Sequence, residues 1–241
     1  MGLRSIIQQV RTTTVGALDE WAPPTSVANH ADGWRPDEPD AYCPRCGASA
    51  GPGSVLGDGC PFCRDKPIAW QRLIRLGLYR EPLDDWIRAM KFEGRWSWAA
   101  EFGRLLADRV GKPFDEARHV VVPVPMHWRR RWRRGYNQAA LIARALAKAR
   151  RWRMIDLLMR TRPTAPQTTV PPSSRHANVR NSFGIAAIDL TGWEVVLVDD
   201  VKTSGATLSA CTRLLRKAGA RSVTAAVAAV ADPRAQDFEA S

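Results

Sequence analysis

Two adjacent acids followed by a short run of hydroxyl residues carry the clearest chemistry in this sequence. Asp199 and Asp200 come directly after an apolar stretch, and residues 203–207 then read Thr-Ser-Gly-Ala-Thr. The small residues can hold a phosphate through backbone N–H groups, while the carboxylates suit sugar hydroxyls or a hydrated Mg2+. The pattern indicates a ribose-phosphate site. The competing interpretation, a surface turn with incidental acids, does not require this combination of acids and hydroxyls.

Four cysteines form a second group with defined chemistry. Cys43 and Cys46 make one Cys-x-x-Cys pair, and Cys60 and Cys63 make another after a glycine-rich interval. Four thiolates at this spacing predict a tetrahedral Zn2+ site, and a complete set of protein ligands leaves no open position for catalysis, so we expect a structural metal. The alternatives are a redox dithiol or two disulfides, although neither pair lies in a thioredoxin-like βαβ pattern.

A third group is cationic and aromatic, and we call residues 127–134 the Arg/Trp patch. Arginine pairs well with phosphate and tryptophan stacks on bases, so this composition is typical of single-stranded nucleic acid binding. The open alternative is that the arginines are solvated and the tryptophans lie half-buried against the cysteine module. The residues predicted to contact nucleic acid are Arg129, Arg130, Arg131, Trp132 and Arg133.

These groups must be positioned by strands and helices, which the apolar pattern predicts. Residues 195–198 read as a buried strand that the two acids end, and the segment from Leu208 to Leu215 then follows helical spacing. Further strands are expected over residues 119–126, 154–159 and 222–230, and helices over residues 83–106 and from about residue 138. Strands alternating with helices predict an α/β fold, a mostly parallel sheet with helices on both faces.

One long segment fits neither pattern. Residues 160–183 are rich in Pro, Thr and Ser and have little periodicity. The segment is too long for an ordinary connection in a compact domain, so we expect a functional lid that closes over a site.

Composition indicates an anionic partner. The 241 residues carry a formal charge of +12, and all but six of the 36 basic residues are arginine. Nucleic acid, a phosphorylated substrate and a membrane surface all fit this charge, while genome composition is an equal explanation for the scattered arginines. No run approaches the roughly 18 apolar residues of a membrane span, and the start of the sequence lacks the order of a signal peptide, so we expect a cytoplasmic protein.

Taken together, these landmarks resemble the ComF (ComFC-like) family of competence-associated phosphoribosyltransferase-like proteins over about residues 40–232. The acid pair and its loop resemble the phosphoribosyl pyrophosphate (PRPP) signature of type I phosphoribosyltransferases. Besides these and the four cysteines, the matches are Tyr79, Lys91-Phe92 with Gly94, Pro123-Val-Pro125, Arg134-Gly-Tyr-Asn-Gln138, Arg162 with Thr164 and Gln167, Arg175-x-x-Asn178 and Phe183. A composition rich in Pro, Gly and Asp predicts a flexible leader over residues 1–40, and the cysteine spacing predicts a zinc ribbon over 41–66. The resemblance implies a phosphoribosyltransferase-like domain over 67–241.

The resemblance also implies roles for individual residues. Asp199 and Asp200 would take the ribose hydroxyls of PRPP, and Arg175, on the closing segment with Gln167 and Asn178, would stabilise departing pyrophosphate. The 5-phosphate would lie on Thr203, Ser204, Gly205, Ala206 and Thr207, and pyrophosphate with Mg2+ would lie near Pro125, Met126 and His127. Thr203 stands where purine-salvage relatives often have an acid, so the base for a purine ring nitrogen is missing and 6-oxopurine salvage is disfavoured.

For function, the resemblance implies a PRPP-binding protein of natural competence that also binds single-stranded DNA. Its partner would be a helicase-like ComF protein at the cytoplasmic side of the uptake channel, which would bring it to the inner face of the membrane. Phosphoribosyl transfer is one expectation. The alternative is a non-catalytic zinc-containing scaffold or PRPP sensor that docks the helicase partner.

Overall fold

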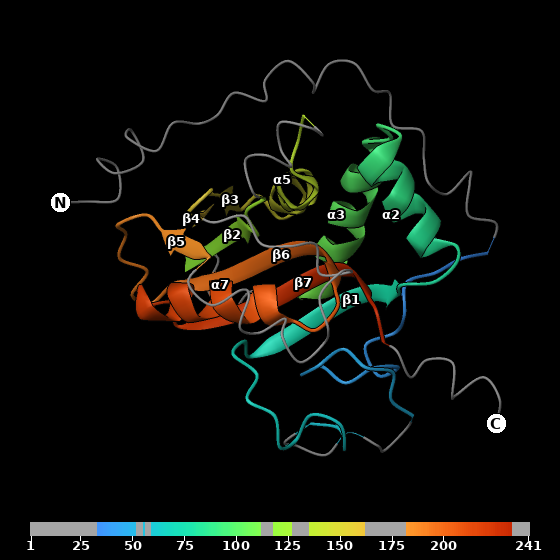
Figure 1. Ribbon diagram of the computed structural model, residues 1–241, viewed down its shortest axis with the longest axis horizontal. Helices are drawn as coiled ribbons and strands as arrows, with labels where there is room; N and C mark the ends of the chain where they lie inside the picture. Colours follow the sequence, from blue (N-terminus) through green and yellow to red (C-terminus); the bar gives the residue numbers. More distant parts are fainter. Residues whose placement is uncertain are drawn as a thin grey trace.

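A parallel β-sheet forms the centre of the structure. The computed structural model describes residues 33–51, 55, 59–111, 118–126, 135–161 and 182–232, and every structural statement below concerns these residues. Five parallel strands lie in the order β1-β7-β6-β2-β3 (Figure 1). Their bounds are β1 Arg72–Leu78, β7 Ser222–Val230, β6 Glu194–Lys202, β2 His119–Pro123 and β3 Arg153–Met154.

Helices cover both faces of this sheet, as the sequence predicts. α2, α3 and α5 lie on one side and α7 lies on the other (Figure 1). Alternate residues of β6 serve the two layers, because Val196 and Val198 pack with the three helices whereas Val195 and Leu197 pack with α7. The helices are α2 Leu83–Phe92, α3 Ser97–Val110, α5 Gln138–Arg150 and α7 Ala206–Lys217. The predicted α/β class is confirmed.

The strand that carries the acid pair is longer than its apolar run predicts. β6 continues through both acids to Lys202, because β7 extends to Val230 and keeps pairing with it: Asp199 lies opposite Val227, and Val201 lies opposite Ala229. The prediction that the acids end the strand is therefore wrong. They lie within the last residues of an ordered strand, where the backbone ladder fixes their direction.

Two other strand predictions need correction. The run 154–159 was expected as one strand, but it divides between β3 and β4 Leu158–Arg160, and β4 pairs in a separate antiparallel sheet with β5 Phe183–Ile185. β1 was not predicted at all, because Arg72, Arg75 and Gly77 interrupt its apolar pattern. Arg75 is nevertheless buried, with 1% of its surface exposed.

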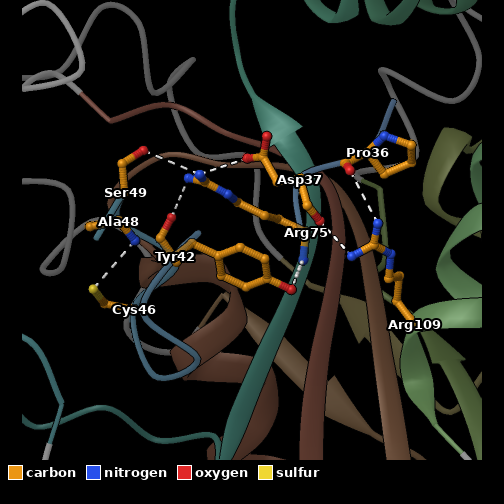
Figure 2. A network of polar contacts seen from close by, with 9 residues as sticks. Pro36, Asp37, Tyr42, Cys46, Ala48, Ser49, Arg75 and Arg109 are labelled. Atoms are coloured by element: carbon orange, nitrogen blue, oxygen red, sulfur yellow. Dashed lines mark hydrogen bonds and ion pairs between the residues drawn. The ribbon is translucent and has the colours of Figure 1, made fainter. Parts of the chain in front are cut away.

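Arg75 is buried because a ring of acceptors surrounds it (Figure 2). Its guanidinium lies 2.7 Å from a carboxylate oxygen of Asp37 and donates to the Gly47 carbonyl at 2.5 Å and to the Ser49 hydroxyl at 3.2 Å. The guanidinium also lies over the ring of Tyr42. These contacts join the cysteine module to β1.

Residues 33–40, the last part of the expected flexible leader, contact α2 and β1. Trp34 packs edge-on against Trp86 of α2 with ring centroids 5.1 Å apart, and the Asp37 backbone N–H donates to Leu76 of β1 at 2.7 Å. Residues 1–32 of the predicted leader lie outside the described residues. Among the helices that the structure describes, none is both long and apolar enough to cross a membrane.

Candidate functional site

The two acids lie at the carboxyl edge of the sheet beside a lysine from another element. Asp199 and Asp200 are both partly buried. The Asp200 carboxylate lies 3.1 Å from the ammonium of Lys91, which is in the last turn of α2. Both side chains of this pair are less than one-fifth exposed. Lys91 is among the residues that carry the family resemblance but was given no role there, and the structure places it at the acid pair.

Asp199 lies in an environment that favours its protonated form. Burial, together with the neighbouring charge of Asp200, raises the pKa of Asp199 to about 8, although the Asp200 backbone N–H and the charges of Lys91 and Arg160 oppose the shift. An Asp199 that keeps its proton at neutral pH can donate a hydrogen bond as well as accept one. Ligand hydroxyls or a bound cation would favour the ionised form instead.

The segment after β6 bends sharply into α7. Gly205 precedes the helix with a φ of 76°, a backbone conformation that favours glycine, and the Ala206 N–H donates to the Ser204 hydroxyl oxygen at 3.4 Å. The first turn of a helix presents backbone N–H groups that have no intrahelical acceptor, and the helix dipole favours an anion there. Residues 203–207, here called the phosphate loop, therefore combine a positive helix end with two hydroxyl side chains before it.

The end of β2 lies next to the acid pair. The Val124 N–H donates to the Val198 carbonyl at 2.8 Å, so Pro125 and Met126 follow directly beside the strand that carries the acids. Asn137 holds this region to α5, because its amide donates to the Val124 carbonyl at 3.0 Å and its side-chain oxygen accepts from the Ala139 N–H at 3.2 Å. The predicted pyrophosphate position is thus adjacent to the predicted ribose position.

The four cysteines converge on one point. Their Sγ atoms all lie within 4.8 Å of one another, and three of the separations are 3.6, 3.7 and 3.8 Å. A Zn–S distance of about 2.3 Å in a tetrahedron places sulfurs about 3.8 Å apart, whereas a disulfide needs about 2.05 Å. The residues fit a tetrahedral Zn2+, and the disulfide alternative does not fit.

Backbone N–H groups stabilise the thiolate form of one cysteine in this cluster. Burial, the largest influence on Cys43, favours its neutral thiol, but backbone N–H groups of Cys46, Arg45 and Cys60 together with the Cys63 side chain outweigh it and lower the pKa of Cys43 to about 7. Burial raises the pKa of Cys63 to about 11. A metal would supply the charge that holds the remaining thiols as thiolates.

Trp70 connects the cysteine cluster with the phosphate loop, and nothing in the sequence pattern predicts this contact. Its indole N–H donates to the carbonyl of Arg45, inside the first cysteine pair, at 2.8 Å. At the other end its ring lies so close to Gly205 that a β-carbon there would be 2.8 Å from the ring. A cavity of about 440 Å3 lies beside this contact, and its lining includes Trp70, Cys46, Cys63 and residues 202–204.

Several predicted site residues lie outside the described residues. They are His127, the Arg/Trp patch with Arg129, Arg130, Arg131, Trp132 and Arg133, and the closing-segment residues Gln167, Arg175 and Asn178. The described part of the site therefore contains the acid pair, the phosphate loop, Pro125, Met126 and the cysteine cluster, to which the structure adds Lys91 and Trp70.

Comparison with known proteins identifies the family. Residues 99–240 match the protein-family model described as phosphoribosyl transferase domain, which is more than half of the chain. The chain is 35% identical over 192 residues to "DNA utilization protein YhgH" of Salmonella typhi and 32% identical over 192 residues to "Competence protein F" of Haemophilus influenzae. Each match covers 76% of this chain and 81% of the relative.

The chain belongs to the ComF family of phosphoribosyl transferase domain proteins. "Competence protein ComFC" of Bacillus subtilis is 28% identical over 193 residues, which is 76% of this chain and 75% of that protein. The resemblance that the sequence motifs predict is thus confirmed at the level of the family. A phosphoribosyl transferase domain also accounts for the position of the acid pair and phosphate loop at the carboxyl edge of the sheet.

Proposed function

We propose that this ComF-family protein binds PRPP together with Mg2+ at the carboxyl edge of its sheet. The observation that carries the proposal is the continuity of β6, the acid pair, the phosphate loop and α7 in one ordered unit. The carboxylates of Asp199 and Asp200 would accept hydrogen bonds from the ribose hydroxyls, and the phosphate loop would hold the 5-phosphate. Pro125 and Met126 would lie next to the pyrophosphate. Mg2+ would neutralise phosphate charge when bound.

Lys91 supports this assignment through its effect on the acids. Its ammonium stabilises a negative Asp200 and opposes the raised pKa of Asp199, so it favours the ionised carboxylates that ribose hydroxyls require. We propose Lys91 as a positioning residue of the ribose site.

Calorimetric titration of PRPP with Mg2+ tests the binding proposal. The wild type is expected to release binding heat, whereas a protein with Asp199→Ala and Asp200→Ala is expected to release none, because both hydroxyl acceptors are gone. Asp108→Ala is the matched control, since Asp108 is an exposed acid on α3. Equal heat from the wild type and the double variant would reject the proposed site.

We further propose a role in the uptake and handling of DNA, with single-stranded DNA held by the Arg/Trp patch and a helicase-like protein as partner. The support is the names of the relatives, which concern competence and DNA utilization, and the density of arginine in the patch. Neither phosphoribosyl transfer nor PRPP sensing is required for this part of the proposal.

A salt titration of oligonucleotide binding tests the DNA proposal. Each phosphate contact contributes about −0.7 to the slope of log affinity against log salt for a single strand. Replacing the four patch arginines Arg129, Arg130, Arg131 and Arg133 by Ala should therefore flatten the slope by roughly 3. The control replaces four scattered, exposed arginines, Arg88, Arg104, Arg153 and Arg221. An equal change of slope in both variants would contradict the proposal that the Arg/Trp patch binds single-stranded DNA.

A further inference from the structure

A short chain of direct contacts links the cysteine cluster to the phosphate loop. Arg45 lies between two of the cysteine ligands, and its guanidinium donates to the carbonyls of Cys63, Arg64 and Lys66 at 3.0 to 3.1 Å. Arg45 thereby fixes the second cysteine pair relative to the first. Its own carbonyl accepts the indole N–H of Trp70. The position of Trp70 therefore depends on the geometry of both cysteine pairs.

Trp70 is well placed to transmit that geometry. The side chain is 5% exposed and packs in the apolar layer between the sheet and α7. An indole held by a hydrogen bond at one end and by close packing along its length has few alternative rotamers. Movement of the Arg45 carbonyl would therefore move the ring or leave a buried donor without its acceptor.

The far end of the Trp70 ring contacts the phosphate loop at Gly205. Gly205 has the left-handed conformation that starts α7, and the Trp70 ring occupies the space where a β-carbon would be. A displaced ring would press on or release this turn. The backbone N–H groups of the phosphate loop depend on the turn for their common direction.

A second contact supports the same connection. Gly47, next to the ligand Cys46, packs so closely on Leu73 of β1 and Val230 of β7 that a β-carbon would come within 3.0 Å of both side chains. The Leu73 N–H also donates to the Pro44 carbonyl at 2.7 Å. The first cysteine pair is therefore packed against β1 and β7 and also bonded to Trp70, so it cannot shift without disturbing the sheet or the ring.

We propose that Trp70 is a positioning residue that couples occupancy of the four-cysteine site to the affinity of the phosphate loop. Metal bound by the four cysteines would fix the loop that carries the Arg45 carbonyl. This carbonyl accepts the hydrogen bond from Trp70, and the Trp70 ring packs against the turn at Gly205. Coupling free energies are reciprocal, so a ligand in the loop must strengthen metal retention by the same factor that metal strengthens ligand binding. This inference rests on the proposed binding of PRPP, whereas the metal-side contacts are independent of it.

The experiment measures the equilibrium distribution of zinc between the full chain and a colorimetric chelator, in the presence and absence of PRPP and Mg2+. We expect saturating PRPP to lower the release of zinc from the wild type to the chelator by at least about fivefold in the apparent dissociation constant, the lower end of typical couplings between sites. Trp70→Phe removes the indole N–H and shortens the ring, so PRPP should change its zinc release less than twofold. Trp152→Phe is the matched control, since Trp152 stacks on His119 at the opposite end of the sheet, and it should behave as the wild type.

Calorimetry on the same samples separates the two proposals. If PRPP produces no binding heat with the wild type, the proposed function fails. If PRPP binds the wild type but leaves zinc release unchanged, or if Trp70→Phe retains the full PRPP effect, the coupling through Trp70 is contradicted while PRPP binding stands. A purely structural role for Trp70 would make Trp70→Phe weaken zinc binding by the same factor with and without PRPP, and this result would also overturn the proposal.

Discussion

At the scale of single residues, Asp199 has the most informative environment in the site. Its carboxyl group is partly buried, lies beside a second acid and has a pKa raised to about 8. An ordinary aspartate has a pKa near 3.9. The native protein without ligand therefore holds a proton on Asp199 across a pH range in which the unfolded chain has lost it.

This difference predicts how stability depends on pH. Between about pH 4 and pH 8 the native state binds the extra proton, so the contribution of Asp199 to stability falls as pH rises through this range. Asp199→Asn is always neutral and should avoid that loss. Relative to the wild type, its free energy of unfolding should rise by about 2 kcal/mol between pH 5 and pH 8.5, a figure reduced for the partial exposure of the group. Urea unfolding at the two pH values measures the difference. Asp108→Asn is the control, and an identical pH dependence of wild type and Asp199→Asn would contradict the assigned pKa.

At the scale of elements, the unit formed by β6, the phosphate loop and α7 depends on Gly205. Gly205→Ala should destabilise the protein by about 1–3 kcal/mol, because its backbone has a φ of 76° and the new methyl group would meet the buried Trp70 ring. PRPP affinity should fall as well. Gly51→Ala is the control, since no atom lies within 4 Å of a β-carbon there, and its stability should change by less than about 0.5 kcal/mol. Equal unfolding midpoints for the two variants in urea would contradict this account of the turn.

The same elements show what the sequence can and cannot predict. Continuous apolar runs correctly predict β7 and the start of β6, and helical spacing correctly predicts α5. The end of β6 was missed because a neighbouring strand, not local propensity, extends it through the acids. β1 was missed because Arg75 makes the strand read as polar. Its burial depends on partners about 30 residues away, which periodicity does not reveal.

The candidate site divides in the same way. The acid pair, the phosphate loop and the four cysteines are local motifs, and the sequence predicts each of them. Lys91 and Trp70 contact site residues more than 100 positions distant, so residue spacing does not predict these contacts, although Lys91 is among the residues of the family resemblance. Tertiary packing alone brings α2 to Asp200 and the start of β1 to Gly205.

At the scale of the whole molecule, Arg75 joins the cysteine module and residues 33–40 to the sheet (Figure 2). Arg75→Met should cost about 3–5 kcal/mol, because it leaves the Asp37 carboxylate and the Gly47 carbonyl without their buried donor. Arg104→Met is the control, since Arg104 pairs with Glu101 on the exposed surface of α3 and should contribute about 0–1 kcal/mol. Thermal unfolding of the zinc-loaded proteins measures both changes. Similar small losses from the two variants would show that Arg75 does not anchor the module.

The central claim is that the acid pair and the phosphate loop form one PRPP site, and a crystal structure of the protein soaked with PRPP and Mg2+ tests it most directly. We predict electron density for the ribose hydroxyls against Asp199 and Asp200 and for the 5-phosphate on residues 203–207. Density for PRPP at another position, or an empty phosphate loop at saturating PRPP, would contradict the claim.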